Sequence, residues 1–182
     1  YEMLDCLVGS GDVYKRQLDA DSTTVVDAST ATTLTGSAAD INTAYASSGI
    51  SGLGDETVTI NDTSVAATTL NTLNGNTTGT VDASSVTTVT GSVADVNTMY
   101  ATAGLSGGGD EAITISDTTI AASDLNTLDG NTTGAIDAST LKTITGTGAD
   151  ALTAFESAGI SGLVFDASSY IAGYTDLMAA FS

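Results

Sequence analysis

Residues 37–56, with the sequence SAADINTAYASSGISGLGDE, reveal how the chain is built, because nearly the same string returns at residues 92–111 as SVADVNTMYATAGLSGGGDE. A third, shorter copy begins at Thr147, so that the copies start at the equally spaced positions 37, 92 and 147. Regular self-similarity of this kind is typical of repeat proteins, in which each repeat packs mainly on its neighbours. The chain is therefore predicted to fold as a stack of repeats.

Each repeat also contains a second, related segment that divides it into two coils. Residues 70–79 (LNTLNGNTTG) return at residues 125–134 as LNTLDGNTTG. Helix-like motifs centred on Ile41, Leu70, Val96 and Leu125 follow one another at alternating longer and shorter intervals. We therefore predict a β-solenoid with short α-helices in each coil, with about 27–28 residues per coil and a two-coil repeat of about 55 residues.

Local patterns predict where strands and helices lie within a coil. Alternation of Val or Ile with Thr predicts a half-buried strand at residues 57–60, and residues 112–115 repeat it. Further strands are predicted at residues 32–35, 64–66, 87–90, 119–121 and 142–145. Capping boxes predict helix starts at Ser37, Ser92 and Thr147. These helices are predicted to close at glycines with left-handed backbone, and shorter helices near Leu70 and Leu125 to end at Gly75 and Gly130. The closing glycines are Gly49, Gly104 and Gly159.

Stacked coils would also align polar side chains on the outside of the first strand. Equivalent residues in adjacent coils lie about 4.8 Å apart, so like charges in every second coil would be separated by about 9.6 Å. That distance is about one Debye length or more in salty surroundings. The predicted ladder is Asp27, Thr59, Asp82, Thr114 and Asp137.

The composition excludes two classes of partner. The net charge is −19, with only three Lys and Arg residues and no His, Pro or Trp. Nucleic acids and anionic membrane surfaces both require basic side chains, so neither is expected to bind. The Val, Ile and Leu residues recur at regular positions, which argues against a disordered chain. No apolar run is long enough for a transmembrane helix.

Three segments are expected from these patterns. Residues 1–17 (YEMLDCLVGSGDVYKRQ) break the repeat and resemble translated sequencing-adapter sequence at the ends of metagenomic reading frames. This resemblance implies that they are not native; the alternative is a native N-terminal cap. Residues 18–164 are predicted to form the repeat region. Residues 165–182 lose the repeat pattern and are expected to be a divergent terminal coil or a truncated end.

Acidic residues are the only candidates for a metal site. Asp55, Glu56, Asp110 and Glu111 lie in loops and are candidates for weak surface calcium binding. The sequence contains neither an EF-hand loop nor the glycine-rich calcium repeat of β-rolls. A solvated acidic loop is the alternative, and no other cofactor is expected.

Two other functions compete with a structural role. Residues 33–35, 88–90 and 143–145 each have a Thr-x-Thr pattern, which ice-binding β-solenoids also use, but the coils between them interrupt the row. Paired carboxyl groups could in principle hydrolyse glycosides. Enzymes of β-helical fold break their repeats to form a cleft, whereas these repeats stay nearly identical. Without a histidine or a P-loop, the chain is predicted not to be an enzyme, and no catalytic or cofactor-binding residue is assigned.

The strings TGSAADINTAYASSGISGLGDE and TGSVADVNTMYATAGLSGGGDE resemble repeats of giant extracellular proteins of marine bacteria, especially picocyanobacteria. The resemblance covers residues 18 to about 164. It implies a secreted or cell-surface location and a non-catalytic structural, adhesive or scaffold role. Expected partners are neighbouring repeats of the same long chain and cell-surface polymers or glycans. The alternative is an ice-, calcium- or glycan-binding β-solenoid module.

Overall fold

A computed structural model describes residues 25–164, and the predictions for residues 1–17 and 165–182 lie outside this range. Its helices are α3 (Ala38–Ala46), α4 (Ala67–Asn76), α5 (Val93–Ala101), α6 (Ala122–Asn131) and α7 (Gly148–Glu156). Its strands are β1 (Val26–Asp27), β2 (Thr33–Gly36), β3 (Ile50–Ser51), β4 (Thr57–Ile60), β5 (Ser64–Ala66), β6 (Val81–Asp82), β7 (Thr88–Gly91), β8 (Leu105–Ser106), β9 (Ala112–Ile115), β10 (Thr119–Ala121), β11 (Ile136–Asp137), β12 (Thr143–Thr145) and β13 (Ile160–Ser161).

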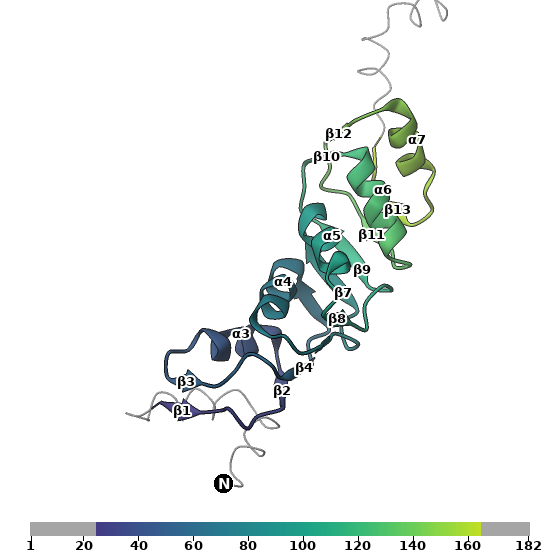
Figure 1. Cartoon of the computed structure of the whole chain (residues 1–182). Helices are drawn as coiled ribbons and strands as arrows, with labels where there is room; N and C mark the ends of the chain where they lie inside the picture. Colours follow the sequence, from purple (N-terminus) through teal and green to yellow (C-terminus); the bar gives the residue numbers. More distant parts are fainter. Residues whose placement is uncertain (1–24, 165–182) are drawn as a thin grey trace, which may run out of the picture.

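The elements follow one another in chain order along one direction, from α3 at one end to α7 at the other (Figure 1). Each helix packs against the next one in sequence, so α3 to α7 form a single layer. All paired strands are parallel, and they lie along the other side of this layer. The arrangement is an elongated α/β structure in which contacts run between successive turns of the chain.

The predicted β-solenoid is wrong. Residues 25–164 form an α/β fold with five helices and several parallel sheets, and no closed β-solenoid is formed. The strands divide among four sheets, with strand orders β1-β3, β2-β4-β6-β8, β5-β7-β9-β11-β13 and β10-β12. In a solenoid wall, strands of the same kind would stack on one another. Here each strand pairs with a strand from a different position in the repeat; β2, for example, pairs with β4 and not with its equivalent β7.

The physical reason is a mismatch between helix spacing and strand pairing. Helices α3, α4, α5 and α6 begin at positions 38, 67, 93 and 122. Paired strand positions are closer together in sequence than these helix starts, as in Thr33 with Thr57 and Val58 with Val81. Each turn therefore shifts the strands relative to the helices. The repeat has five strand positions, and the five-stranded sheet contains one strand from each of them.

This shift also corrects the predicted outer ladder. Asp27 is paired with Ser51 and not with Thr59. Two predicted neighbours do pair, namely Thr59 with Asp82 and Thr114 with Asp137. In the four-stranded sheet the row runs Thr35, Thr59, Asp82, Ser106. This row contains a single acidic residue. Like charges are therefore separated because the other strands of the sheet have Thr or Ser at this position, and not because Asp and Thr alternate from coil to coil.

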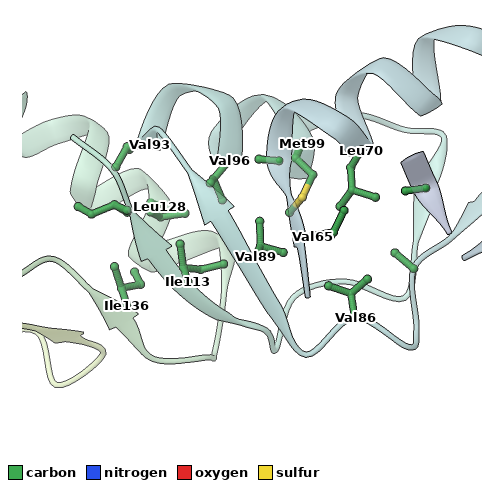
Figure 2. Close-up of a cluster of buried hydrophobic side chains, with 14 of the residues drawn as sticks. Val65, Leu70, Val86, Val89, Val93, Val96, Met99, Ile113, Leu128 and Ile136 are labelled. Carbon is green, nitrogen blue, oxygen red and sulfur yellow. The ribbon is translucent and has the colours of Figure 1, made fainter. Parts of the chain in front are cut away.

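The core lies between the helix layer and the strands. Figure 2 shows Leu70, Val96 and Met99 on the helix side, facing Val89 and Ile113 from the strands. All five side chains are at most 1% exposed. Burial of apolar side chains such as these stabilises the helices, which at nine or ten residues are too short to be stable alone.

The predicted helix starts are confirmed, and α4 and α6 end at Asn76 and Asn131, one residue beyond the predicted Gly75 and Gly130. The predicted left-handed closure of the other three helices at Gly49, Gly104 and Gly159 is wrong. The Ser37 hydroxyl accepts a hydrogen bond from the Asp40 N–H at 3.1 Å, and Ser92 and Thr147 cap α5 and α7 in the same way. Helix α3 ends at Ala46, before Gly49, and its C-cap residue Ser47 has an extended backbone with φ −73°. No left-handed cap is formed, because a short turn that contains the glycine leads from each of these helices into the next strand, as at residues 47–49 between α3 and β3.

Asparagine side chains join consecutive helices. The Asn42 amide donates to the Thr69 carbonyl at 3.1 Å, and the Asn71 amide donates to the Asp95 carbonyl at 3.0 Å. Asn97 and Asn126 make the same bond to the first turns of α6 and α7. The recurring Asn of the repeat motif thus sets the position of each helix on its neighbour.

Candidate functional site

The predicted acidic residues occupy two equivalent loops. Asp55 and Glu56 lie between β3 and β4, and Asp110 and Glu111 lie between β8 and β9. Both aspartates are exposed, but Glu56 is only 1% exposed and Glu111 only 2%. The structure therefore places the aspartates at the surface and the glutamates in the interior.

Each buried glutamate is bound by a tyrosine from the preceding helix. The Tyr45 hydroxyl donates to Glu56 Oε2 at 2.9 Å, and the Tyr100 hydroxyl donates to Glu111 Oε2 at 2.9 Å. A backbone N–H supplies a second donor to each carboxyl group. Gly54 N lies 2.9 Å from Glu56 Oε2, and Gly109 N lies 2.8 Å from Glu111 Oε2. Both donors are uncharged groups. Their hydrogen bonds replace those that the carboxyl group would make with water at the surface.

The main chain of each glutamate is held by the following half-repeat. The buried Thr77 hydroxyl donates to the Glu56 carbonyl oxygen at 2.8 Å, and Thr132 does the same for Glu111 at 3.3 Å. Thr132 Oγ1 also accepts a hydrogen bond from Gly134 N at 2.9 Å. The tyrosine–glutamate pair thus connects one helix, the loop after it and the loop of the next turn.

The environment of the tyrosines changes their acidity. The pKa of Tyr45 is raised to about 12, mainly by burial; the hydrogen bond with Thr77 lowers it and the neighbouring Glu56 carboxyl group raises it. Burial likewise raises the pKa of Tyr100 well above the usual range, with Glu111 acting in the same direction. Both tyrosines therefore keep their protons under all ordinary conditions, which suits a hydrogen-bond donor and not a base.

In the third repeat the tyrosine and the glutamate are both missing. Phe155 occupies the place of Tyr45 and Tyr100, and the Gly-Asp-Glu triplet is missing after residues 161–163. A phenylalanine has no hydroxyl to donate, so a buried glutamate beside it would lose its main side-chain donor. The prediction that both glutamates lie at the surface is wrong, and this joint replacement is the sequence signal that points to a buried pair.

The hydrogen bonds of each tyrosine–glutamate pair join a helix to two loops. Within residues 25–164, no group of three or more His, Cys, Asp or Glu side chains is placed to hold a metal ion. In both loops the glutamate already accepts hydrogen bonds, which leaves the neighbouring aspartate as the exposed carboxyl group. The predicted calcium ligands are therefore not brought together as a joint oxygen-ligand set of the kind calcium takes.

One further sequence match, which is not among the candidates above, also lacks a reactive geometry. Residues 104–108 (GLSGG) fit the G-x-S-x-G pattern of a nucleophilic serine. Such a serine sits on a sharp turn from a strand into a helix. Ser106 instead lies in β8, its hydroxyl donates to the Val81 carbonyl at 3.3 Å, and the chain continues into β9. The sequence contains no histidine to act as its base.

The Thr-x-Thr segments do not form a continuous surface. Strand β7 is paired with β5 on one side, and Thr88 and Thr90 stand beside Ser64 and Ala66. On its other side, Thr88 stands beside Ala112 and Thr90 beside Thr114, so a row of threonines continues at only one of the two positions. The threonine rows are short because each sheet contains strands of different kinds.

No family model matches this sequence, and no curated protein or solved structure is significantly similar to it. None of the helices between residues 25 and 164 is long and apolar enough to cross a bilayer.

The raised tyrosine pKa values predict an alkaline transition. In the unfolded chain a tyrosine ionises at about pH 10. Since the pKa of Tyr45 is about 12 in the folded state, the unfolded state loses this proton first as pH rises. The stability that Tyr45 contributes is therefore complete below about pH 10 and is lost between about pH 10 and 12. A pH titration of the folded protein, followed by tyrosinate absorbance, should show that Tyr45 and Tyr100 ionise above pH 10. The Tyr45→Phe variant should show one such tyrosine fewer. Ionisation of Tyr45 and Tyr100 in the folded protein at about pH 10, as in an unfolded chain, would contradict this expectation.

Proposed function

We propose that this chain is a non-catalytic structural repeat module of a long secreted or cell-surface protein, with a scaffold or adhesive role. The observation that carries the proposal is the repetition of the same contacts at each turn. The tyrosine–glutamate pair occurs at equivalent places in two successive repeats, and the asparagine link joins every consecutive pair of helices from α3 to α7. Because the same polar contacts join each turn to the next, added repeats would lengthen the molecule and hold each turn in the same way.

The shape and charge support the same function. The elements progress along one direction (Figure 1), so that adding repeats extends the molecule and does not enlarge a single core. A net charge of −19 keeps such long chains soluble and repels neighbouring copies. Neighbouring repeats of the same chain are the partners that this arrangement favours. The resemblance of the repeats to giant extracellular proteins of marine bacteria also supports a location outside the cell.

The location can be tested on the organism that produces the protein. Brief proteinase K treatment of intact cells should release peptides from residues 25–164 into the medium, because a surface module is accessible without lysis. Peptides of an abundant cytosolic enzyme, followed in the same samples, serve as the control for leakage. Recovery of the repeat peptides only after lysis would contradict the proposed function.

A further inference from the structure

The asparagines between residues 25 and 164 fall into two groups. Six of the eight donate a hydrogen bond from the side-chain amide, and each of the six is followed by a threonine. The six are Asn42, Asn71, Asn76, Asn97, Asn126 and Asn131. The other two are Asn61, which is followed by Asp62, and Asn74, which is followed by Gly75. A hydrogen bond and a branched neighbour thus hold the amides of the first group in place, whereas Asn74 has neither.

Asn74 lies in the last turn of α4 and faces the turn that follows α5. A Cβ added to Gly104, in that turn, would lie 2.2 Å from Asn74 Oδ1. This oxygen is buried, and it has no hydrogen-bond partner within residues 25–164. Since buried polar atoms are almost always hydrogen-bonded, the amide is held here by packing alone. Helix α4 ends two residues later, at Asn76, and helix ends fray.

Gly75 leaves the main-chain nitrogen after Asn74 unshielded. The residue is exposed, and no atom lies within 4 Å of a Cβ added to it. Glycine has no side chain and has the widest choice of backbone conformation, so its nitrogen can approach the Asn74 Cγ atom when the end of α4 opens. The sequence contains an Asn-Gly pair only at this place.

The second repeat shows that the fold accepts an aspartate at the same place. Asp129 in α6 is the equivalent of Asn74. The Ser157 hydroxyl donates to Asp129 Oδ2 at 2.8 Å, and a Cβ added to Gly159 would lie 2.5 Å from Asp129 Oδ1. A carboxyl group therefore fits against the glycine of the following turn, as the amide of Asn74 does in the first repeat.

We propose that Asn74 is a deamidation site, at which the chain converts its own asparagine into aspartate or isoaspartate with water as the co-reactant. The Gly75 main-chain nitrogen attacks Asn74 Cγ, so that a new C–N bond forms and the Cγ–Nδ2 bond breaks. Ammonia leaves with the proton of the Gly75 N–H, and a succinimide ring remains. Water then opens the ring. Cleavage of the new bond at Cγ gives aspartate, whereas cleavage of the bond at the main-chain carbonyl carbon of Asn74 gives isoaspartate.

The folded structure controls the rate of this reaction. Burial of Asn74 Oδ1 and the helical backbone keep Cγ away from the Gly75 nitrogen, so the last turn of α4 must open first. Aspartate adds a negative charge between two half-repeats. Isoaspartate also adds a carbon atom to the main chain and interrupts α4. The inference concerns the chemistry of this joint and is independent of the proposed scaffold role.

Incubation of the full chain in warm, mildly alkaline buffer, followed by peptide mass spectrometry, tests the proposal. Asn74 should lose its amide before any other asparagine of residues 25–164. In heavy-oxygen water the new carboxyl group should carry the label. Unfolding in urea should accelerate the loss at Asn74 about tenfold or more, because local opening is then no longer required.

Gly75→Ala is the matched variant. The added methyl group has open space and alanine favours a helix, so the fold is kept. Because the methyl group hinders the approach of the nitrogen and the helix opens less often, the loss at Asn74 should fall about tenfold. Circular dichroism of the variant should match that of the unmodified chain.

Two results would overturn the proposal. Loss of the amide at Asn61, which is exposed and precedes Asp62, as fast as at Asn74 would show that the end of α4 is not the reactive place. Loss at Asn74 at the same rate in Gly75→Ala as in the unmodified chain would show that the Gly75 nitrogen is not the attacking group.

Discussion

Replacing Gly134 with alanine is expected to lower the free energy of unfolding by about 3 kcal/mol, because the new methyl group has no space. A Cβ at this position would lie 2.0 Å from the carbonyl oxygen and 2.5 Å from the carbonyl carbon of Glu111. Both are backbone atoms just before β9, so no side-chain rotation can relieve the overlap. The loop must move, and the Thr132 bonds to Gly134 N and to the Glu111 carbonyl would be strained with it.

The chain offers a matched control close by. Gly130 lies in α6, and no atom comes within 4 Å of a Cβ added there. Gly130→Ala should therefore leave stability unchanged or raise it by up to about 1 kcal/mol, since alanine favours a helix over glycine. Urea unfolding of both variants, followed by circular dichroism, measures the difference. If Gly134→Ala is no less stable than Gly130→Ala, the close approach of the two loops in this structure is wrong.

Tyr100→Phe is expected to cost about 2–3 kcal/mol, since it removes a hydroxyl donor from a buried carboxyl group. Glu111 is 2% exposed and would keep the Gly109 N–H, at 2.8 Å from Oε2, as its donor in the loop. Water cannot replace the lost donor without opening the contact between α5 and the loop. The loss should appear in the free energy of unfolding and as faster hydrogen exchange of residues 107–111.

A double-mutant cycle separates this pair from a general effect of packing. In the Tyr100→Phe background, Glu111→Gln should cost less than it does alone, with a coupling energy of about 1–2 kcal/mol. Asp110→Asn changes the adjacent exposed acid and should alter stability by less than about 0.5 kcal/mol. Strict additivity of Tyr100→Phe and Glu111→Gln would show that the hydroxyl and the carboxyl group do not stabilise each other.

Local signals predicted the secondary structure well. The Thr57–Ile60 and Ala112–Ile115 strands follow from alternation of apolar and polar residues, and both are observed with these bounds. The helix starts at Ser37, Ser92 and Thr147 follow from capping residues that act within the first turn of each helix. Helices α3, α5 and α7 end before the expected glycines, because those glycines belong to the following turn, whereas α4 and α6 end within one residue of the expected position.

The candidate site was only half predicted. Glu56 and Glu111 stand out in the sequence as acids of their loops, but a surface position was expected, because carboxyl groups are almost never buried without a partner. Their partners, Tyr45 and Tyr100, lie 11 residues earlier on a helix. Only the packing of each loop against its helix brings these groups to 2.9 Å.

The repetitive character of the chain, the starts of its helices and strands, and the identity of its interior apolar residues can all be read without a structure. These features depend on interactions between residues close in the chain or on a pattern that recurs from one repeat to the next. The pairing of the strands, the division into separate sheets and the burial of two glutamates are properties of the folded molecule alone. They depend on the path of the chain around each turn, in which paired strands are closer in sequence than successive helices, and no local pattern records that difference.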